Sequence, residues 1–286
     1  MKKYNYEYIQ SSLRATDKPS DDYADELQVG GYRILKECQS TLFYDTIDIV
    51  GRQESIASGF IDEGHLENQA YLHSLDVLNS LQKNAYNFVE LGTGYGAPSL
   101  AFAGFIDNTD MFSNIKNYNI IGIEGERNHY EWTKRILTEQ IKGNVKIVNG
   151  AVTTYDGYIN FQQGNSANDY GQSIGSGESV ECYRLDTLLK QNNISTVDFL
   201  HIDIQGEELN VINDSIHLFN KINFMYIGTH SSHIHYSILN ILNQSNIFNI
   251  IFNMPINETT EFPEYGIVKP YPYMDGLIFC QNKNLI

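Results

Sequence analysis

The chain of 286 residues is acidic, with 35 aspartates and glutamates against 19 lysines and arginines and a formal net charge of −16. This charge argues against binding to a phosphate backbone, which needs clusters of lysine and arginine, so no nucleic-acid partner is expected. The sequence contains neither a signal peptide nor an apolar run of about 18 residues, and its three cysteines are widely spaced. Together these features predict a cytoplasmic protein without a membrane span or a disulfide framework.

The first part of the chain, residues 1–80, is predicted to form a helical N-terminal segment. Apolar residues recur at helical spacing within residues 23–40 and again within residues 66–82. No obvious linker separates this segment from residues 81–286, which are expected to form a single α/β domain. We expect the N-terminal segment to lie over the side of the site where a substrate enters.

The remainder of the chain alternates apolar runs with amphipathic stretches. Predicted strands lie at residues 86–91, 119–124, 144–149, 197–203, 222–229, 246–252 and 275–281. This alternation predicts an α/β fold with a doubly wound, mostly parallel seven-stranded sheet that carries helices on both faces. The link before the final strand contains four prolines and is too rich in turns for a crossover helix, so the last strand is expected to be antiparallel.

A glycine-rich turn, FVELGTGYG, joins the first of these strands to an apolar helix. Glycines at such a turn let the backbone approach a ligand, and the helix N-terminus adds a partial positive field. The spacing is G-x-G-x-G after the acidic Glu90, whereas dinucleotide-binding turns read G-x-G-x-x-G. Glu90, Gly92, Gly94 and Gly96 therefore favour a cationic ligand that carries an amino acid over a nicotinamide cofactor. The alternative is a purely structural turn.

Two further strand ends offer places for an adenosine ligand. Glu124 ends the second predicted strand, about thirty residues after the glycines, where a carboxylate can accept hydrogen bonds from both ribose hydroxyls. Gly125 follows it, and an exposed acid at a strand end is the alternative interpretation. The third strand ends at Asn149, and the small residues Gly150 and Ala151 then provide a flat position against which an adenine can stack. A plain turn explains these last residues equally well.

Asp203 stands at the carboxyl end of the fourth predicted strand, VDFLHID, where doubly wound sheets bind their ligands. A buried carboxylate needs a partner, and a cationic ligand, a metal ion or a polar substrate can each supply one. Capping of the helix that follows is the alternative. His201 lies two residues earlier on the same face of the strand and is expected to be a core histidine.

His230 ends the fifth predicted strand and lies next to Asp203 if the fourth and fifth strands are neighbours. With His233 and His235 it forms the pattern H-x-x-H-x-H. A continuous helix would send the latter two histidines to different faces, and no cysteine is near, so the pattern does not predict a zinc site. His230 remains a candidate site residue, with a capping or core histidine as the alternative.

Taken together, these motifs resemble those of a class I S-adenosylmethionine-dependent methyltransferase of the FkbM type, from about Gly59 to the C-terminus. The resemblance rests on VELGTGYG, IGIEGERNHYEW and AVTTYDGYINF, and most specifically on VDFLHIDIQGEEL followed by IGTHS. Within the most specific motif, His201 and Gln205 stand where the family more often has lysine and glutamate.

The resemblance implies that residues 81–286 bind S-adenosyl-L-methionine as cofactor and that the chain is an O-methyltransferase. Its acceptor would be a hydroxyl of a small molecule, most often a sugar, a glycan precursor or a secondary metabolite. Asp203 and His230 are the candidate catalytic residues, as base or as acceptor-orienting groups, and Asp203 can instead hold a divalent cation. Tyr170 and Gln172 resemble the family's loop over the cofactor. The sequence does not indicate an oligomeric state.

Two other functions are compatible with parts of this pattern. A methyltransferase-like module that has lost catalysis would serve as a binding partner in an assembly. An NAD-dependent oxidoreductase would use the same strand, turn and helix, although the glycine spacing and Glu90 speak against it.

Overall fold

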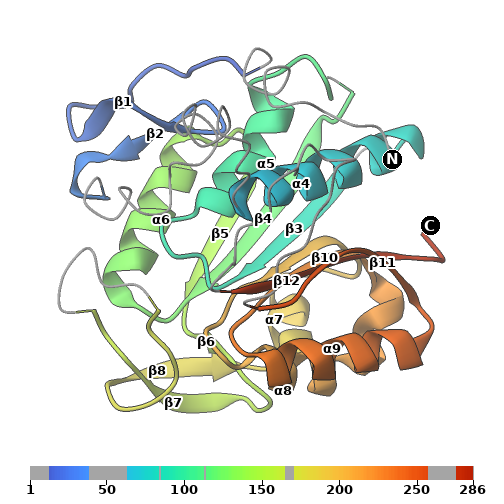
Figure 1. Ribbon diagram of the computed structural model, residues 1–286. Helices are drawn as coiled ribbons and strands as arrows, with labels where there is room; N and C mark the ends of the chain where they lie inside the picture. The colour runs from blue at the N-terminus through green and yellow to red at the C-terminus, as the bar shows by residue number, and fades with distance from the viewer. Residues whose placement is uncertain are drawn as a thin grey trace.

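The computed structural model describes residues 13–38, 63–83, 85–112, 114–164, 171–256 and 275–285. They form an α/β fold on one large sheet with helices on both faces (Figure 1). Tyr170 and residues 257–274, which include most of the proline-rich link, lie outside the described residues. None of the described helices combines the length and the apolar character that a bilayer crossing requires.

The large sheet has seven strands, and all seven predicted strands are confirmed. Their order across the sheet is β11 (Phe248–Met254), β12 (Gly276–Asn282), β10 (Ile222–Thr229), β9 (Val197–Ile202), β3 (Ala85–Leu91), β4 (Asn117–Glu124) and β5 (Asn144–Asn149). The strands from β10 to β5 pair in parallel, whereas β12 is antiparallel to both of its neighbours. β9 and β10 are buried along their whole length, which explains why most of their residues are apolar.

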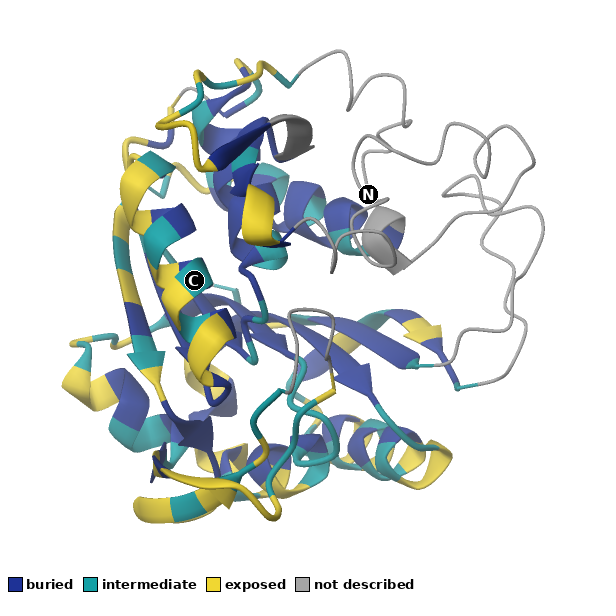
Figure 2. Cartoon of the chain, turned by 90° about the vertical axis from the view of Figure 1, so that its left-hand side faces the viewer, coloured by how far each residue is buried: buried dark blue, intermediate teal, exposed yellow. Residues whose placement is uncertain are grey.

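Six helices of the described residues cover the sheet. One face carries α4 (Glu63–Ser80), α5 (Ala97–Asp107) and α6 (Arg127–Gln140). The other face carries α7 (Leu185–Gln191), α8 (Glu208–Asp214) and α9 (Ser232–Ser245). Each face buries its own apolar cluster, and Figure 2 shows the strands as a buried layer between helices whose outer sides are exposed. Because β10, β9, β3, β4 and β5 pair in parallel, their carboxyl ends lie at the same edge of the sheet.

The N-terminal segment differs from its prediction. Residues 66–80 do belong to a helix, α4, which ends two residues before the predicted stretch does. Within residues 23–40, however, the structure has an antiparallel hairpin of β1 (Tyr23–Val29) and β2 (Tyr32–Leu35), followed by the short 3-10 helix η1 (Lys36–Cys38). Gly30 and Gly31 form its turn with positive φ, and a Cβ on Gly30 would lie 2.3 Å from the Leu100 carbonyl oxygen of α5. Close packing against α5 therefore outweighs the helical spacing of the apolar residues.

A second, three-stranded sheet was not predicted. It consists of β6 (Ala151–Val152), β8 (Glu178–Tyr183) and β7 (Gly157–Phe161). Its strands are short and half exposed, so they lack the continuous apolar runs that identified the large sheet. The small sheet begins two residues after β5 ends, which places it beside the carboxyl edge of the large sheet.

Candidate active site

The glycine-rich turn after β3 packs directly against the segment that follows β9. Asp203 N donates a hydrogen bond to the Leu91 carbonyl oxygen at 2.9 Å. Gly92 has φ +81°, and a Cβ there would lie 1.7 Å from the carbonyl oxygen of Asp203. Gly96 has φ +88° and caps the N-terminus of α5. The close approach at Gly92 admits only glycine, and it brings two of the predicted site segments together.

Glu124 holds the same turn from the neighbouring strand. Its Oε2 accepts a hydrogen bond from Gly94 N at 2.8 Å, and its Oε1 accepts one from Glu126 N at 2.8 Å. Burial raises the pKa of Glu124 to about 7, although these backbone donors act in the opposite direction. Each carboxylate oxygen has a second lone pair, so the group can still accept hydrogen bonds from a ligand.

Glu90 lies deeper than its neighbours. Its side chain is fully buried, Ser99 donates a hydrogen bond to Oε2, and Oε1 has no hydrogen-bond partner among the described residues. Burial is the main cause that raises the pKa of Glu90 to about 8. Glu90 is also the register partner of His201 on β9. A fully buried carboxyl group therefore lies beneath the glycine-rich turn.

The remaining predicted cofactor residues lie along the edge beside the small sheet. Gly125 packs under the Phe161 ring, whose atoms would come within 2.8 Å of a Cβ at that position. Ala151 is buried at the start of β6. Gln172 is partly buried, and a Cβ on the preceding Gly171 would lie 3.6 Å from Gln205 Oε1. The described end of this loop thus reaches the turn after Asp203.

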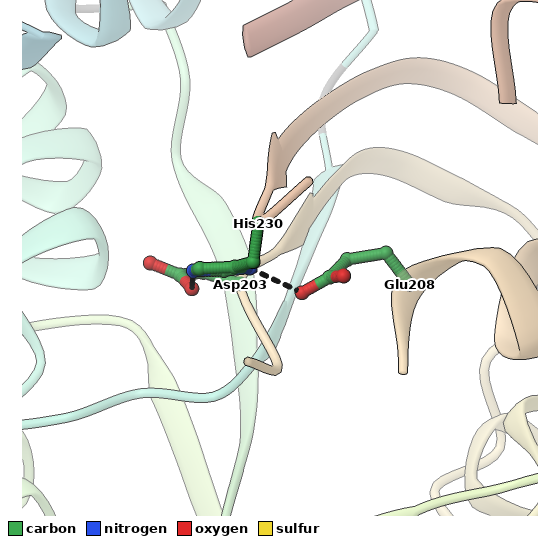
Figure 3. Close-up of side chains that lie close together, drawn as sticks. All are labelled: Asp203, Glu208 and His230. Atoms are coloured by element: carbon green, nitrogen blue, oxygen red, sulfur yellow. Dashed lines mark hydrogen bonds and ion pairs between the residues drawn. The ribbon is translucent and has the colours of Figure 1, made fainter. Parts of the chain in front are cut away.

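Asp203 and His230 do lie together, and a third residue, Glu208, joins them. His230 Nε2 lies 3.3 Å from Asp203 Oδ1, while His230 Nδ1 lies 2.8 Å from Glu208 Oε1. Figure 3 shows the imidazole between the two carboxylates. Among the described residues, these three form the one group whose donor atoms are arranged closely enough to hold a metal ion.

Within the described part of the chain, hydrogen-bond donors reach only one of the two carboxylate oxygens of Asp203. Oδ1 faces His230 Nε2 and accepts a hydrogen bond from Gln205 Nε2 at 3.1 Å, while no described residue donates to Oδ2. Its side chain is 44% exposed, so a substrate can reach it. Burial opposes the charge of Asp203, but hydrogen bonds and the positive charge of His230 lower its pKa below the ordinary value.

His201 is a core residue, as predicted, but it also has a partner. Its Nε2 lies 2.6 Å from Oε1 of Glu67 on α4, and its ring stacks on Tyr226. Burial disfavours the imidazolium, but Glu67 and the charges of Glu90 and Asp203 outweigh it and raise the pKa of His201. This contact attaches α4 to the strand that carries Asp203.

The other two histidines of the H-x-x-H-x-H pattern do not join the site. His235 is buried between Thr229 Oγ1 and Asn253 Oδ1, at 2.8 Å from each. His233 is not part of the metal-capable group found among the described residues. Ser231 caps α9 by accepting a hydrogen bond from Ile234 N, which fixes the turn directly after His230.

Comparison with known proteins gives one family match. The model of the methyltransferase FkbM domain matches residues 95–248, which is more than half of the chain. A protein of Jannaschia sp. (strain CCS1), named as a proposed methyltransferase, is 24% identical over 181 residues. That alignment covers 56% of this chain and 61% of the relative, so the chain spans less than two thirds of the relative's length.

Three solved structures that match this chain share little sequence identity with it. The N-terminal domain of human METTL16 in complex with SAH has 12% identity and a TM-score of 0.41, and the match covers 75% of this chain and 69% of that one. Precorrin-6y C5,15-methyltransferase from Geobacter metallireducens GS-15 has 11% identity and a TM-score of 0.41, with 76% and 87% covered. An rRNA methylase from Streptococcus thermophilus has 10% identity and a TM-score of 0.40, with 73% and 94% covered.

Proposed function

Because the chain belongs to the FkbM methyltransferase family, whose methyl donor is S-adenosylmethionine, we propose that it methylates a hydroxyl of a sugar, a glycan precursor or a secondary metabolite. Asp203 is the main support for a hydroxyl acceptor. It stands at the carboxyl end of the central strand, directly over the glycine turn, with one carboxylate oxygen open to a substrate.

The residues around the glycine turn fit S-adenosylmethionine. The buried Glu90 has an oxygen without a hydrogen-bond partner, which suits a ligand with a positive charge nearby. Glu124 would accept hydrogen bonds from the ribose hydroxyls, and the turn at Gly92 and Gly94 would let the backbone approach the ligand. Ala151 would provide the flat contact for the adenine. We also assign Gly96, Gly125, Tyr170 and Gln172 to the cofactor side of the site.

Methyl transfer to a hydroxyl requires that the acceptor loses a proton. Bound S-adenosylmethionine supplies a methyl group activated by its sulfonium charge. In our proposal, Asp203 Oδ2 accepts the hydrogen bond and then the proton of the acceptor hydroxyl. Gln205 and His230 hold Oδ1 and so fix the direction of Oδ2. Most of the acceleration would come from the positioning of donor and acceptor, which contributes up to about 7–11 kcal/mol in well-oriented reactions.

The charge of the site supports a neutral acceptor. Asp203 and Glu208 flank His230, and the charges of all three act on Asp275, which precedes β12. Three carboxyl groups around one imidazole repel phosphates but accept hydrogen bonds from hydroxyls. This arrangement favours a sugar or another polyol over a nucleic acid. We further propose that α4, which Glu67 attaches to β9 through His201, forms part of the acceptor side.

Calorimetric titration with S-adenosylhomocysteine, with NADH in parallel, tests the cofactor first. We expect only S-adenosylhomocysteine to bind.

Incubation with S-adenosylmethionine and a panel of sugars, nucleotide sugars and RNA, read by mass spectrometry, then tests the acceptor. A gain of one methyl group on a sugar supports the proposal, whereas methylation of RNA alone would refute it. Binding without any methylation after a broad screen would favour a module that has lost catalysis. Parallel reactions with EDTA or Mg²⁺ test whether Asp203 holds a divalent cation.

Glu124 predicts a pH dependence of cofactor binding. The ionised carboxylate would accept hydrogen bonds from both ribose hydroxyls. The affinity for the cofactor should therefore fall as the pH falls through the pKa of Glu124, which is about 7. Between pH 8 and pH 6 the dissociation constant for S-adenosylhomocysteine should rise roughly tenfold by proton linkage. In Glu124→Gln the affinity should be lower at pH 8 and should lose the part of the dependence centred near pH 7, while a part from Glu90, whose pKa is about 8, should remain. Glu131→Gln, on the exposed side of α6, is the control. An unchanged profile in Glu124→Gln would exclude the ribose assignment.

A further inference from the structure

Glu208 is a buried carboxylate whose contacts reach beyond its own helix, to the preceding turn and to His230. Its side chain is 0% exposed, although it begins the short helix α8. Oε1 accepts hydrogen bonds from Ile204 N at 3.2 Å and from Gly206 N at 3.0 Å. Backbone N–H groups only donate, so Oε1 acts as an acceptor in these contacts. The turn that follows β9 thus holds the carboxylate in place beneath the candidate active site.

This carboxylate determines the state of the His230 ring. Glu208 Oε1 lies 2.8 Å from His230 Nδ1. An ionised carboxylate can only accept, so Nδ1 must carry a hydrogen and donate it. The other ring nitrogen, Nε2, is then the atom 3.3 Å from Asp203 Oδ1 (Figure 3). The exposed fractions of the side chains rise from 0% for Glu208 through 16% for His230 to 44% for Asp203. The three side chains therefore form a series of contacts that runs from the buried Glu208 through His230 to the partly exposed Asp203.

We propose that Glu208 is a positioning residue of the methyltransferase site, which holds His230 with a proton on Nδ1 and directs Nε2 at Asp203. This role rests on the proposed function, because it concerns the group that receives the acceptor's proton. Glu208 does not touch the acceptor in this arrangement. It fixes His230, and His230 fixes the oxygen of Asp203 that is turned away from the acceptor. Asp203 Oδ2 is thereby left as the single accepting oxygen.

The surrounding charges agree with this assignment. Among the described residues, the titratable groups that interact with His230 are Asp203 after β9, Glu208 on α8 and Asp275 before β12. The charge of His201 also acts on Asp203. Burial opposes a charge on His230, but the hydrogen bonds and charges of Asp203 and Glu208 outweigh it and raise the pKa of His230 to about 10. The contacts of both ring nitrogens with carboxylates therefore favour the charged form of His230, in which each nitrogen carries a hydrogen. His230 donates to Asp203 and does not act as the base.

The role of Glu208 can be tested without a known acceptor by NMR titration of the histidine rings in the full-length protein. His230 is assigned from the resonance that disappears in His230→Gln. In the wild type we expect His230 to stay protonated through pH 8. In Glu208→Gln its titration midpoint should fall by about one pH unit or more, because an opposite charge in contact shifts a pKa by about 1–3 units. Ring nitrogen shifts report whether Nδ1 keeps its hydrogen.

Glu207→Gln is the matched control. This neighbouring glutamate loses the same charge, but its carboxylate bonds Asn210 at the surface and does not contact His230. An equal midpoint in Glu208→Gln, Glu207→Gln and the wild type would overturn the proposal. If Glu208→Gln does not fold, a wild-type midpoint near the ordinary value of about 6.5 would overturn it by itself. The titration does not depend on methyl transfer, so failure of the proposed function would appear separately, in the binding and methylation assays.

Discussion

Replacing Asp203 by asparagine should lower kcat for methyl transfer by about 10²–10⁴-fold, the usual contribution of a positioned base. Asparagine matches the size of the aspartate, so the backbone contact with Leu91 and the approach to Gly92 should persist. The variant presents an amide that cannot take the proton of the acceptor hydroxyl. Single-turnover methylation, with the accepted sugar in excess, measures the loss. Titration with S-adenosylhomocysteine should show an affinity within roughly a factor of three of the wild type, because the cofactor contacts lie on other residues.

A loss of methyl transfer without a loss of affinity for S-adenosylhomocysteine would distinguish a base from a structural carboxylate at position 203. Asp186→Asn on α7 is the control, because that side chain is 35% exposed, close to the exposure of Asp203, and pairs with Arg184 away from the site. It should leave both quantities unchanged. Full turnover in Asp203→Asn would show that the carboxylate is structural. An equal loss of affinity and turnover would place Asp203 at the cofactor and not at the acceptor.

The large sheet could be predicted because each of its strands carries its own signal. β9 and β10 are covered on both faces, so most of their residues are apolar, with only a few buried polar residues between them. The hairpin of β1 and β2 could not be separated from a helix in the same way. Its apolar residues happen to repeat at helical spacing, and the deciding contact, Gly30 against the backbone of α5, is distant in the sequence.

The candidate site shows the same limit at the level of side chains. Asp203 and His230 could be paired from the sequence, because they end neighbouring parallel strands. Glu208 was missed because an acid in the first turn of a helix is usually exposed and serves the helix dipole. Its burial depends on the turn at Gln205 and Gly206, which have φ +50° and +108° and fold the carboxylate back under the strand end. An acid two residues after a glycine, at the end of a buried strand, was the available signal.

The contact between Glu67 and His201 was also beyond prediction. These residues are 134 positions apart, and the sequence gives no reason to place α4 over β9. The sequence shows that His201 replaces the lysine that the family more often has at this position. Only the structure shows that this histidine pairs with Glu67 of α4.

Replacing Gly92 by alanine should abolish binding of S-adenosylhomocysteine and lower the free energy of unfolding by about 2–5 kcal/mol. The Cβ would lie 1.7 Å from the Asp203 carbonyl oxygen, which belongs to backbone and cannot rotate away. β3 and the segment after β9 would have to separate, and the hydrogen bond from Asp203 N to Leu91 O would break. Calorimetric titration and urea denaturation at pH 8 measure the two effects.

Gly206→Ala separates steric collision from backbone strain. Gly206 also has positive φ, +108°, but a Cβ there would meet nothing within 4 Å. This variant should lose only about 1–2 kcal/mol of stability, the cost of a left-handed conformation for an L-residue. It should retain S-adenosylhomocysteine binding, because the turn between β3 and α5 is unchanged. If Gly92→Ala bound S-adenosylhomocysteine as tightly as Gly206→Ala, the close approach of the two segments would not be needed for the cofactor, and the glycine turn would be purely structural.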